Sequence, residues 1–213
     1  MRANSLPNVN LERAAIADLL PTQVTIGMRE VDIKRKRWRE KNGEQAICFL
    51  NSHSVPVILG PGNRHYVLDR HHLIRALSDE GLTDLPIKVI ADVSELSDKQ
   101  FWIALENRGW THPFDDEGRR YNYSDIPKSV SDLIDDPFRS LAGALKRGGG
   151  YLKDKSPFSE FHWADFLRTK IERKIVEMDF DHALSMAMNL AVSEDAMALP
   201  GWRGLHARTA ISS

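Results

Sequence analysis

The sequence predicts an α+β fold in which a mixed sheet-and-helix unit, about residues 1–95, is followed by a helical unit, about residues 96–213. Two patterns support this prediction. Short apolar runs bounded by Gly, Pro and Asn, which are typical of strands, concentrate in the first half of the chain. After residue 95 apolar residues recur at helical spacing, with capping residues before the periodic segments.

Strand character is found in four segments of the first unit. They are residues 23–26, 55–59, 65–68 and 86–91. The turn at residues 60–63 (GPGN) joins the second segment to the third, which predicts a hairpin over 55–68. After it, residues 73–77 change to helical periodicity, and we expect this helix to stop near Gly81.

Capping signals mark the expected helices of the second unit. Ser97 stands three residues before Gln100, the spacing of a capping box. The pairs Asp136-Pro137 and Ser156-Pro157 each place a capping side chain before a proline, which predicts helices over about 137–147 and 157–177. A further helix is expected over about 180–193, and the glycines at 148–150 form a flexible joint.

The amino-acid composition indicates which kinds of partner and which cellular compartment to expect. The 29 Lys and Arg residues are balanced by 30 Asp and Glu residues, whereas duplex-DNA binders usually carry a strong basic excess. Nucleic acid is therefore not the favoured partner. The single cysteine, Cys48, lies in an apolar run and is expected to be buried, in a reducing compartment. Residues 1–7 lack the apolar core of a signal peptide and no segment suits a membrane span, so we expect a cytoplasmic protein.

The turn Asp69-Arg70-His71-His72 is the strongest candidate for a functional site. It joins a predicted strand to a predicted helix, and the first turn of a helix directs unpaired N–H groups at one point, where phosphate is the natural guest. Arg70 and the two histidines add charge and hydrogen bonds, while Asp69 can cap the helix, hold Mg²⁺ or accept a proton. The structural alternative is that Asp69 is only an N-cap and that the histidines are satisfied inside the fold.

The hairpin, this turn and the following helix resemble the ParB/sulfiredoxin superfamily. In its free serine kinases the turn reads Asp-Gly-His-His-Arg and lies at a nucleotide site, so Asp69, His71 and His72 match. Arg70 replaces the glycine, where a side chain changes either the approach of phosphate or the backbone angle. Leu73 replaces the arginine, for which Arg70 or Arg75 could substitute. Sulfiredoxin has its reactive cysteine where His71 stands, so sulfiredoxin activity is not expected.

Most of the chain is similar to the sub-family labelled "putative ParB-like nuclease". The stretches that carry this likeness are residues 27–31, 59–62, 69–72, 136–142 and 158–168. A label of this kind is inferred from the fold, and a fold hosts many activities. The likeness therefore predicts the architecture more firmly than it predicts nuclease activity.

The resemblance implies a nucleotide-binding protein that transfers a phosphoryl group from ATP or ADP, with Mg²⁺, to a small hydroxyl compound. Asp69, His72 and Glu30 would be catalytic, with Glu30 in the place of a glutamate that acts on the substrate hydroxyl in the serine kinases. The phosphate or nucleotide ligands would be Arg70, His71, Arg75 and Lys153. The alternatives are a non-catalytic, nucleotide-responsive or DNA-associated ParB-like binding module, and a ParB-like nuclease.

Two expectations concern the surroundings of the turn. Residues 69–72 should line a concave pocket, and residues 150–170 should pack over the first unit and close one side of that pocket.

Nuclease activity is not expected, because only Asp69 and Glu30 supply carboxylates near the turn unless folding adds Glu160 and Asp165. The basic run 34–39 is flanked by acidic residues and is expected to be the solvated face of a helix.

Overall fold

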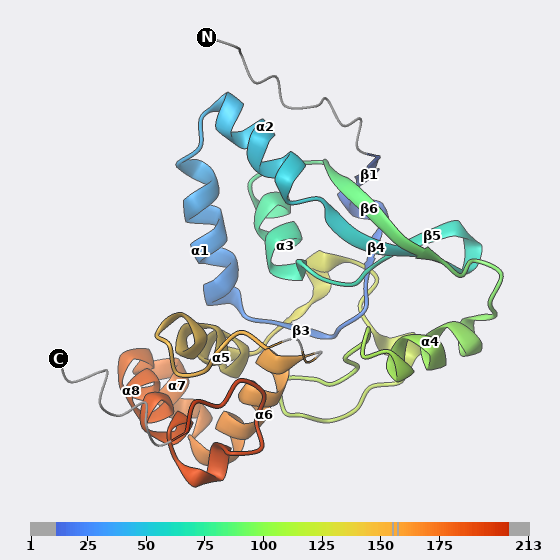
Figure 1. Ribbon diagram of the computed structural model, residues 1–213. Coiled ribbons are helices and arrows are strands. Elements are labelled where there is room, and N and C mark those ends of the chain that lie inside the picture. The colour runs from blue at the N-terminus through green and yellow to red at the C-terminus, as the bar shows by residue number, and fades with distance from the viewer. Residues whose placement is uncertain (1–11, 155, 157, 205–213) are drawn as a thin grey trace.

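A sheet layer and a cluster of helices make up the computed structural model, which describes residues 12–154, 156 and 158–204. The N-terminal segment 1–7 lies outside this described part. Around the sheet lie α1 (Met28–Arg39), α2 (Gly43–Ser52), α3 (His71–Asp79) and α4 (Asp98–Asn107). The cluster below contains α5 (Pro137–Arg147), α6 (Ser159–Lys170), α7 (Arg173–Met178) and α8 (Phe180–Ala191), as Figure 1 shows. The predicted α+β class is confirmed.

Within the described residues, the main sheet is five-stranded and mixed, with the order β1-β6-β4-β5-β2. Its strands are β1 (Arg13–Ala15), β2 (Leu19–Pro21), β4 (Val55–Gly60), β5 (Arg64–Val67) and β6 (Asp84–Asp92). β4 and β5 form the predicted antiparallel hairpin, while β4 pairs parallel with β6. Helix α3 lies in the connection between β5 and β6. The predicted strand at 86–91 is also confirmed.

A second, two-stranded pairing links the sheet layer to the helical cluster. β3 (Thr25–Ile26) pairs parallel with β7 (Ile134–Asp135), and β7 leads directly into α5. The strand expected at 23–26 is thus confirmed for its second half, while Gln23 forms an isolated bridge with His112. This pairing brings the start of α5 next to the segment that leads into α1.

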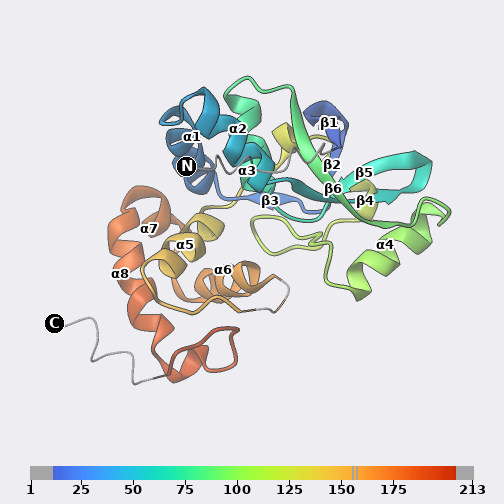
Figure 2. The ribbon, with the colours of Figure 1, turned by 45° about the horizontal axis from the view of Figure 1, so that its top comes forward.

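The two faces of the main sheet carry different cores. Val57 and Val67 face α3, which buries its apolar stripe of Leu73, Ile74 and Leu77 on that side. On the other face Ile58 and Tyr66 pack against Phe101, Trp102 and Leu105 of α4. Side chains that alternate along a strand point to opposite faces, which explains how one hairpin serves both cores. Figure 2 shows α4 on the side of the sheet opposite α1 and α2.

The helix signals at Ser97 and Asp136 are confirmed. Ser97 and Gln100 form a reciprocal capping box on α4, and Asp136 accepts the N–H of Phe138 at the start of α5. Because α4 and β7 pack with the sheet, residues 98–135 share the cores of the first unit. The division into units 1–95 and 96–213 stays a prediction.

The single helix expected over 157–177 is wrong, because the chain forms α6 and α7 instead. Ile171 is extended, with φ −123° and ψ 130°, and its buried side chain packs in the helical core, so the chain turns there and α7 packs against α5 and α8. Ser156 is not the N-cap either. Phe158 takes that place with a left-handed φ of 58°, while the N–H of Ser156 donates to Asp154. The helix expected over 180–193 is confirmed as α8.

Cys48 is exposed, contrary to the expected burial. Helix α2 turns its neighbours Phe49 and Leu50 toward the core instead. Because successive helical residues point about 100° apart, one residue of this apolar run has to face outward. In the described ranges, no helix is both long and apolar enough to cross a membrane.

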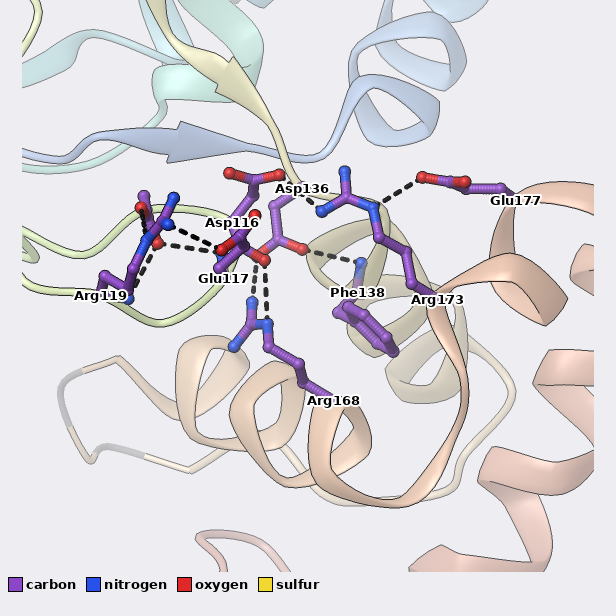
Figure 3. Close-up of polar contacts among 9 residues, drawn as sticks. Asp116, Glu117, Arg119, Asp136, Phe138, Arg168, Arg173 and Glu177 are labelled. Atoms are coloured by element: carbon purple, nitrogen blue, oxygen red, sulfur yellow. Dashed lines mark hydrogen bonds and ion pairs between the residues drawn. The ribbon is translucent and has the colours of Figure 1, made fainter.

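A polar network fastens α6 and α7 to the start of α5 and to the loop at residues 115–119 (Figure 3). Nη2 of Arg168 lies 2.5 Å from Oδ2 of Asp136, and Nε of Arg168 donates to the carbonyl oxygen of Asp116. Arg173 adds ion pairs with Asp116 and Glu177. Asp136 is 1% exposed, and this burial raises its pKa to about 6, although Arg168 and the N–H of Phe138 act in the opposite direction.

Candidate functional site

The turn at residues 69–72 lies where β5 ends and α3 begins, as predicted. Arg70 is the N-cap residue of α3 and has a left-handed backbone, with φ 72° and ψ 21°. The N–H of Arg70 donates to Oδ1 of Asp69 at 2.6 Å, which holds the exposed Asp69 carboxylate beside the helix start. Asp69 therefore bonds to the turn itself and not to the N–H groups of the first helical turn.

The left-handed conformation explains why a glycine suits position 70. This conformation costs a residue with a Cβ about 1–2 kcal/mol, and glycine avoids that cost. Glycine also has more conformational entropy in the unfolded chain, which offsets part of the gain. Arg70→Gly should therefore raise the free energy of unfolding by about 1 kcal/mol in urea titrations. Asn63→Gly is the matched control, because Asn63 also has positive φ but asparagine tolerates it, so the gain should be smaller. A loss of stability in Arg70→Gly would contradict this reading.

His71 and His72 are both held as neutral imidazoles. Nε2 of His71 accepts the N–H of Thr22 at 3.4 Å, and Nε2 of His72 accepts the N–H of Gly27 at 3.2 Å. Burial, together with the nearby charge of Arg139, lowers the pKa of His71 to about 3 and holds that of His72 well below its ordinary value. Since Nε2 accepts, the proton of each ring lies on Nδ1, which becomes a donor.

A cavity of about 410 Å³ opens over this turn. Its lining comes from the turn, from the segment around Trp110, from α5 and from residues 153–161 at the start of α6. The side chains that matter most below are those of Asp69, His71, His72, Trp110, Arg139, Lys146, Lys153, Glu160 and Phe161. The predicted concave pocket is confirmed for Asp69, His71 and His72, and so is the prediction that residues within 150–170 close one side of it.

Arg139 contributes a buried charge to this cavity. It is 4% exposed, and its Nε and Nη1 atoms have no hydrogen-bond partner among the described residues. The guanidinium carbon lies 3.2 Å from the centre of the Phe161 ring, and that ring lies 3.7 Å from the His112 ring. The side chain is thus fixed by aromatic contacts and not by a carboxylate.

A second cavity, of about 280 Å³, adjoins the first. Both are lined by Asp69, His72 and Glu160, and the second adds Glu30, Lys34, His53, Arg70 and Leu73. Between them, Oε1 of Glu160 binds Nζ of Lys146 at 2.7 Å. Burial alone would raise the pKa of Glu160, but Lys146 and Arg139 lower it, so the carboxylate is charged.

Glu30 lies in the second cavity but is already engaged. Its carboxylate forms an ion pair with Arg147 at the end of α5. Gly143 of the same helix leaves room for it, because a Cβ at that position would lie 2.7 Å from the Glu30 carboxyl carbon. Both carboxylate oxygens of Glu30 accept from the Arg147 guanidinium, so they are already occupied within the fold. The structure therefore favours a positioning or structural part for Glu30.

Of the other predicted ligands, Lys153 lines the first cavity and Arg75 does not reach either one. Arg75 binds Asp79 and the carbonyl oxygen of Ser131, at the far end of α3. The addition of Asp165 to the turn is also not observed, since its carboxylate pairs with Arg168. No cluster of three or more His, Cys, Asp or Glu side chains suited to a metal ion occurs in residues 12–154, 156 and 158–204.

Comparison with known proteins places the chain in a family. Residues 12–169 match the family described as "Putative ParB-like nuclease". The chain belongs to this family. The predicted sub-family is thereby confirmed. The comparison with curated proteins gives no match.

Among solved structures, the ParB-like chain is similar to protein Atu1540 from Agrobacterium tumefaciens. The two sequences are 49% identical, the match covers 91% of this chain and 98% of that one, and the TM-score is 0.84. Two structures of the chromosome-partitioning protein ParB from Caulobacter crescentus, one with the parS site and one with CTP-gamma-S, are 15% and 13% identical. The match to the parS complex covers 83% of this chain and 97% of the ParB chain, with a TM-score of 0.30. The match to the CTP-gamma-S complex covers 88% and 94%, with a TM-score of 0.32.

The ParB-like site includes residues that the sequence did not assign to it. Arg139 and Lys146 come from α5, and Trp110 comes from the segment before it. Glu160 of α6, named from the sequence as a carboxylate that folding could add to the turn, lines both cavities. Arg139 and Glu160 lie in stretches 136–142 and 158–168, which carry the family likeness, so a signal for them was present. Lys146 lies outside those stretches, and only its distance to Glu160 identifies it.

Proposed function

We propose that this ParB-like protein binds a nucleotide through its phosphate groups, in the cavity over the first turn of α3. The convergence of hydrogen-bond donors from several elements supports this proposal. The backbone N–H groups of His71 and His72 have no backbone partner among the described residues, and both rings offer Nδ1–H. Such a helix start attracts an anion. Lys146 and Lys153 line the same cavity.

The size and lining of the cavity suit a nucleotide. A volume of about 410 Å³ lies within the range of roughly 300–1,000 Å³ that small-molecule sites occupy. Trp110 supplies aromatic surface for a base. Mg²⁺ usually takes one or two carboxylates and the phosphate oxygens of its nucleotide, so Asp69 would hold the metal of bound ATP or ADP.

Phosphoryl transfer to a small hydroxyl compound has less support than binding. The expected base, Glu30, is paired with Arg147. DNA association also has less support, because Arg35 and Arg39 of the basic run both bind Glu80. Their charges are partly neutralised within the fold, which weakens attraction for a phosphate backbone. Binding of a nucleotide is therefore proposed without a reaction.

A thermal-unfolding screen against ATP, ADP, GTP, CTP and UTP, each with and without Mg²⁺, tests the proposal. A nucleotide at 100 times its dissociation constant adds about 2.7 kcal/mol of stability, which raises Tm by about 5–10 °C in a protein of this size. Asp69→Ala and His72→Ala should reduce the shift, whereas His182→Ala, at an exposed histidine of α8, should retain it. If no nucleotide raises Tm, the proposal fails. Plasmid cleavage abolished by the same two substitutions would favour the nuclease.

A further inference from the structure

Arg139 is the most unusual charged group in the described part of the chain. It is buried on α5, it lines the first cavity, and no carboxylate of a described residue forms an ion pair with it. A buried charge without a partner is strongly destabilising, so proteins rarely keep one without a use. No ion pair within the described fold accounts for the buried charge of Arg139, because the contacts that hold its side chain are aromatic.

The carboxylates that interact electrostatically with Arg139 are hydrogen-bonded to other groups. Asp136 accepts the N–H of Phe138 with one oxygen and pairs with Arg168 through the other. Glu160 binds Lys146. The α3 side chains that line the same cavity are His71 and His72, whose neutral rings offer it donors and not acceptors. The guanidinium therefore lacks a counter-charge within the described fold.

We propose that Arg139 anchors an oxyanion of the bound ligand, so that the ligand is held between α3 and α5. This inference rests on the proposed function and names the residue on which it depends. The anionic group is a phosphate group, which the proposed nucleotide would carry. It would supply the missing acceptor for the guanidinium and at the same time accept from the first turn of α3. A guanidinium is well suited to this, because it remains charged when buried and donates several N–H groups in one plane.

The balance of buried charge supports an anion over a neutral ligand. Lys146 and Glu160 cancel each other, and both histidines are neutral, so among the buried side chains that line the first cavity Arg139 carries a positive charge without an ion-pair partner. Asp69, at the exposed turn, is solvated. The ring of Phe161 covers one face of the guanidinium, so the side chain is already fixed before a ligand arrives. A fixed donor loses little entropy on binding, which increases affinity.

A binding role and a structural role for Arg139 predict opposite effects of the same substitution. Arg139→Met removes a buried, unpaired charge and retains most of the contact with Phe161. The free protein should therefore become more stable, with Tm raised by about 3 °C or more. The affinity for nucleotide should fall by about 10-fold to 100-fold, because a charge-assisted hydrogen bond is lost.

The test compares wild type, Arg139→Met, Arg139→Lys and the control Arg120→Met by calorimetric titration and thermal unfolding with ATP, CTP, inorganic phosphate and acetate. Arg120 is an exposed arginine paired with Glu106, and it is not among the residues that line the cavity. We expect Arg139→Lys to lose less affinity than Arg139→Met, and Arg120→Met to bind as wild type does. Histidine NMR provides a second readout, because an anion beside Arg139 offsets its charge and raises the pKa of His71.

The outcomes separate this inference from the proposed function. If wild type binds phosphate but no nucleotide, and Arg139→Met abolishes that binding, the proposed function fails and the anchor stands. If wild type binds a nucleotide and Arg139→Met binds it equally well, the proposed function stands and the anchor is wrong. A free Arg139→Met protein that unfolds at a lower temperature than wild type would also overturn the inference, since the charge would then be stabilising.

Discussion

Arg168→Met should lower the free energy of unfolding by about 3 kcal/mol at pH 7. The substitution leaves the carboxylate of Asp136, which is 1% exposed, without its guanidinium partner. Breaking a buried pair on one side usually costs about 3–5 kcal/mol. We expect the low end of that range, because Asp136 already has a pKa of about 6 and escapes part of the cost by taking up a proton.

The other members of the network provide the controls for this prediction. Asp136→Asn combined with Arg168→Met removes both charges and keeps an acceptor for the N–H of Phe138, so the double variant should lie within about 1 kcal/mol of wild type. Arg173→Met breaks ion pairs at a side chain that is 40% exposed and should cost less than about 1 kcal/mol. Urea unfolding of the four proteins measures these differences. Equal losses in Arg168→Met and Arg173→Met would show that burial of Asp136 is not the cause.

The second large effect is a loss of stability in mild acid. Burial lowers the pKa of His71 and of His112 to about 3, and that of His72 lies well below its ordinary value. A base whose pKa is depressed by folding stabilises the protein fully above its unfolded pKa of about 6.5, and this stability is lost as the pH falls below 6.5. Each histidine contributes at most about 1.4 kcal/mol per pH unit.

Asp136 opposes this trend, because its pKa is raised and the folded protein binds a proton more readily than the unfolded chain between about pH 6 and 4. The sum is a fall of about 3 kcal/mol in the free energy of unfolding between pH 7 and pH 5.5. Urea titrations at both values check it. His112→Phe, which keeps the contact with Phe161, should reduce the fall by about 1.3 kcal/mol, and His182→Ala should leave it unchanged. A free energy that is constant over this range would contradict the prediction.

Local signals predicted those parts of the fold that neighbouring residues determine. The hairpin over β4 and β5, the capping box at Ser97 and the proline start of α5 are of this kind, since the turn and the cap lie within a few residues of each other. The strands β1, β2 and β3 were not predicted, or only in part, because two or three residues carry no usable alternation. The break at Ile171 depends on a tertiary contact, which outweighs helical periodicity.

The candidate site shows the same limit. The place of Asp69, His71 and His72 was predicted, because a strand, a turn and a helix follow one another there. The roles assigned to these residues and to Lys153 stay predictions. Arg139 comes from a helix nearly 70 positions later in the chain, which the pairing of β3 with β7 and the packing of α5 on α1 bring to the turn. The partner of Glu30 was not visible in the sequence for the same reason.

The close approach of Gly143 to Glu30 has an evolutionary consequence. A glycine inside a helix costs about 1 kcal/mol relative to alanine, so drift alone would readily replace it. Alanine at position 143 would place its Cβ 2.7 Å from the carboxyl group of Glu30, so that side chain would have to shift and disturb its ion pair with Arg147. The two positions should therefore change together among descendants of a common ancestor. A lineage that shortens residue 30 becomes free to acquire alanine at 143 without that shift.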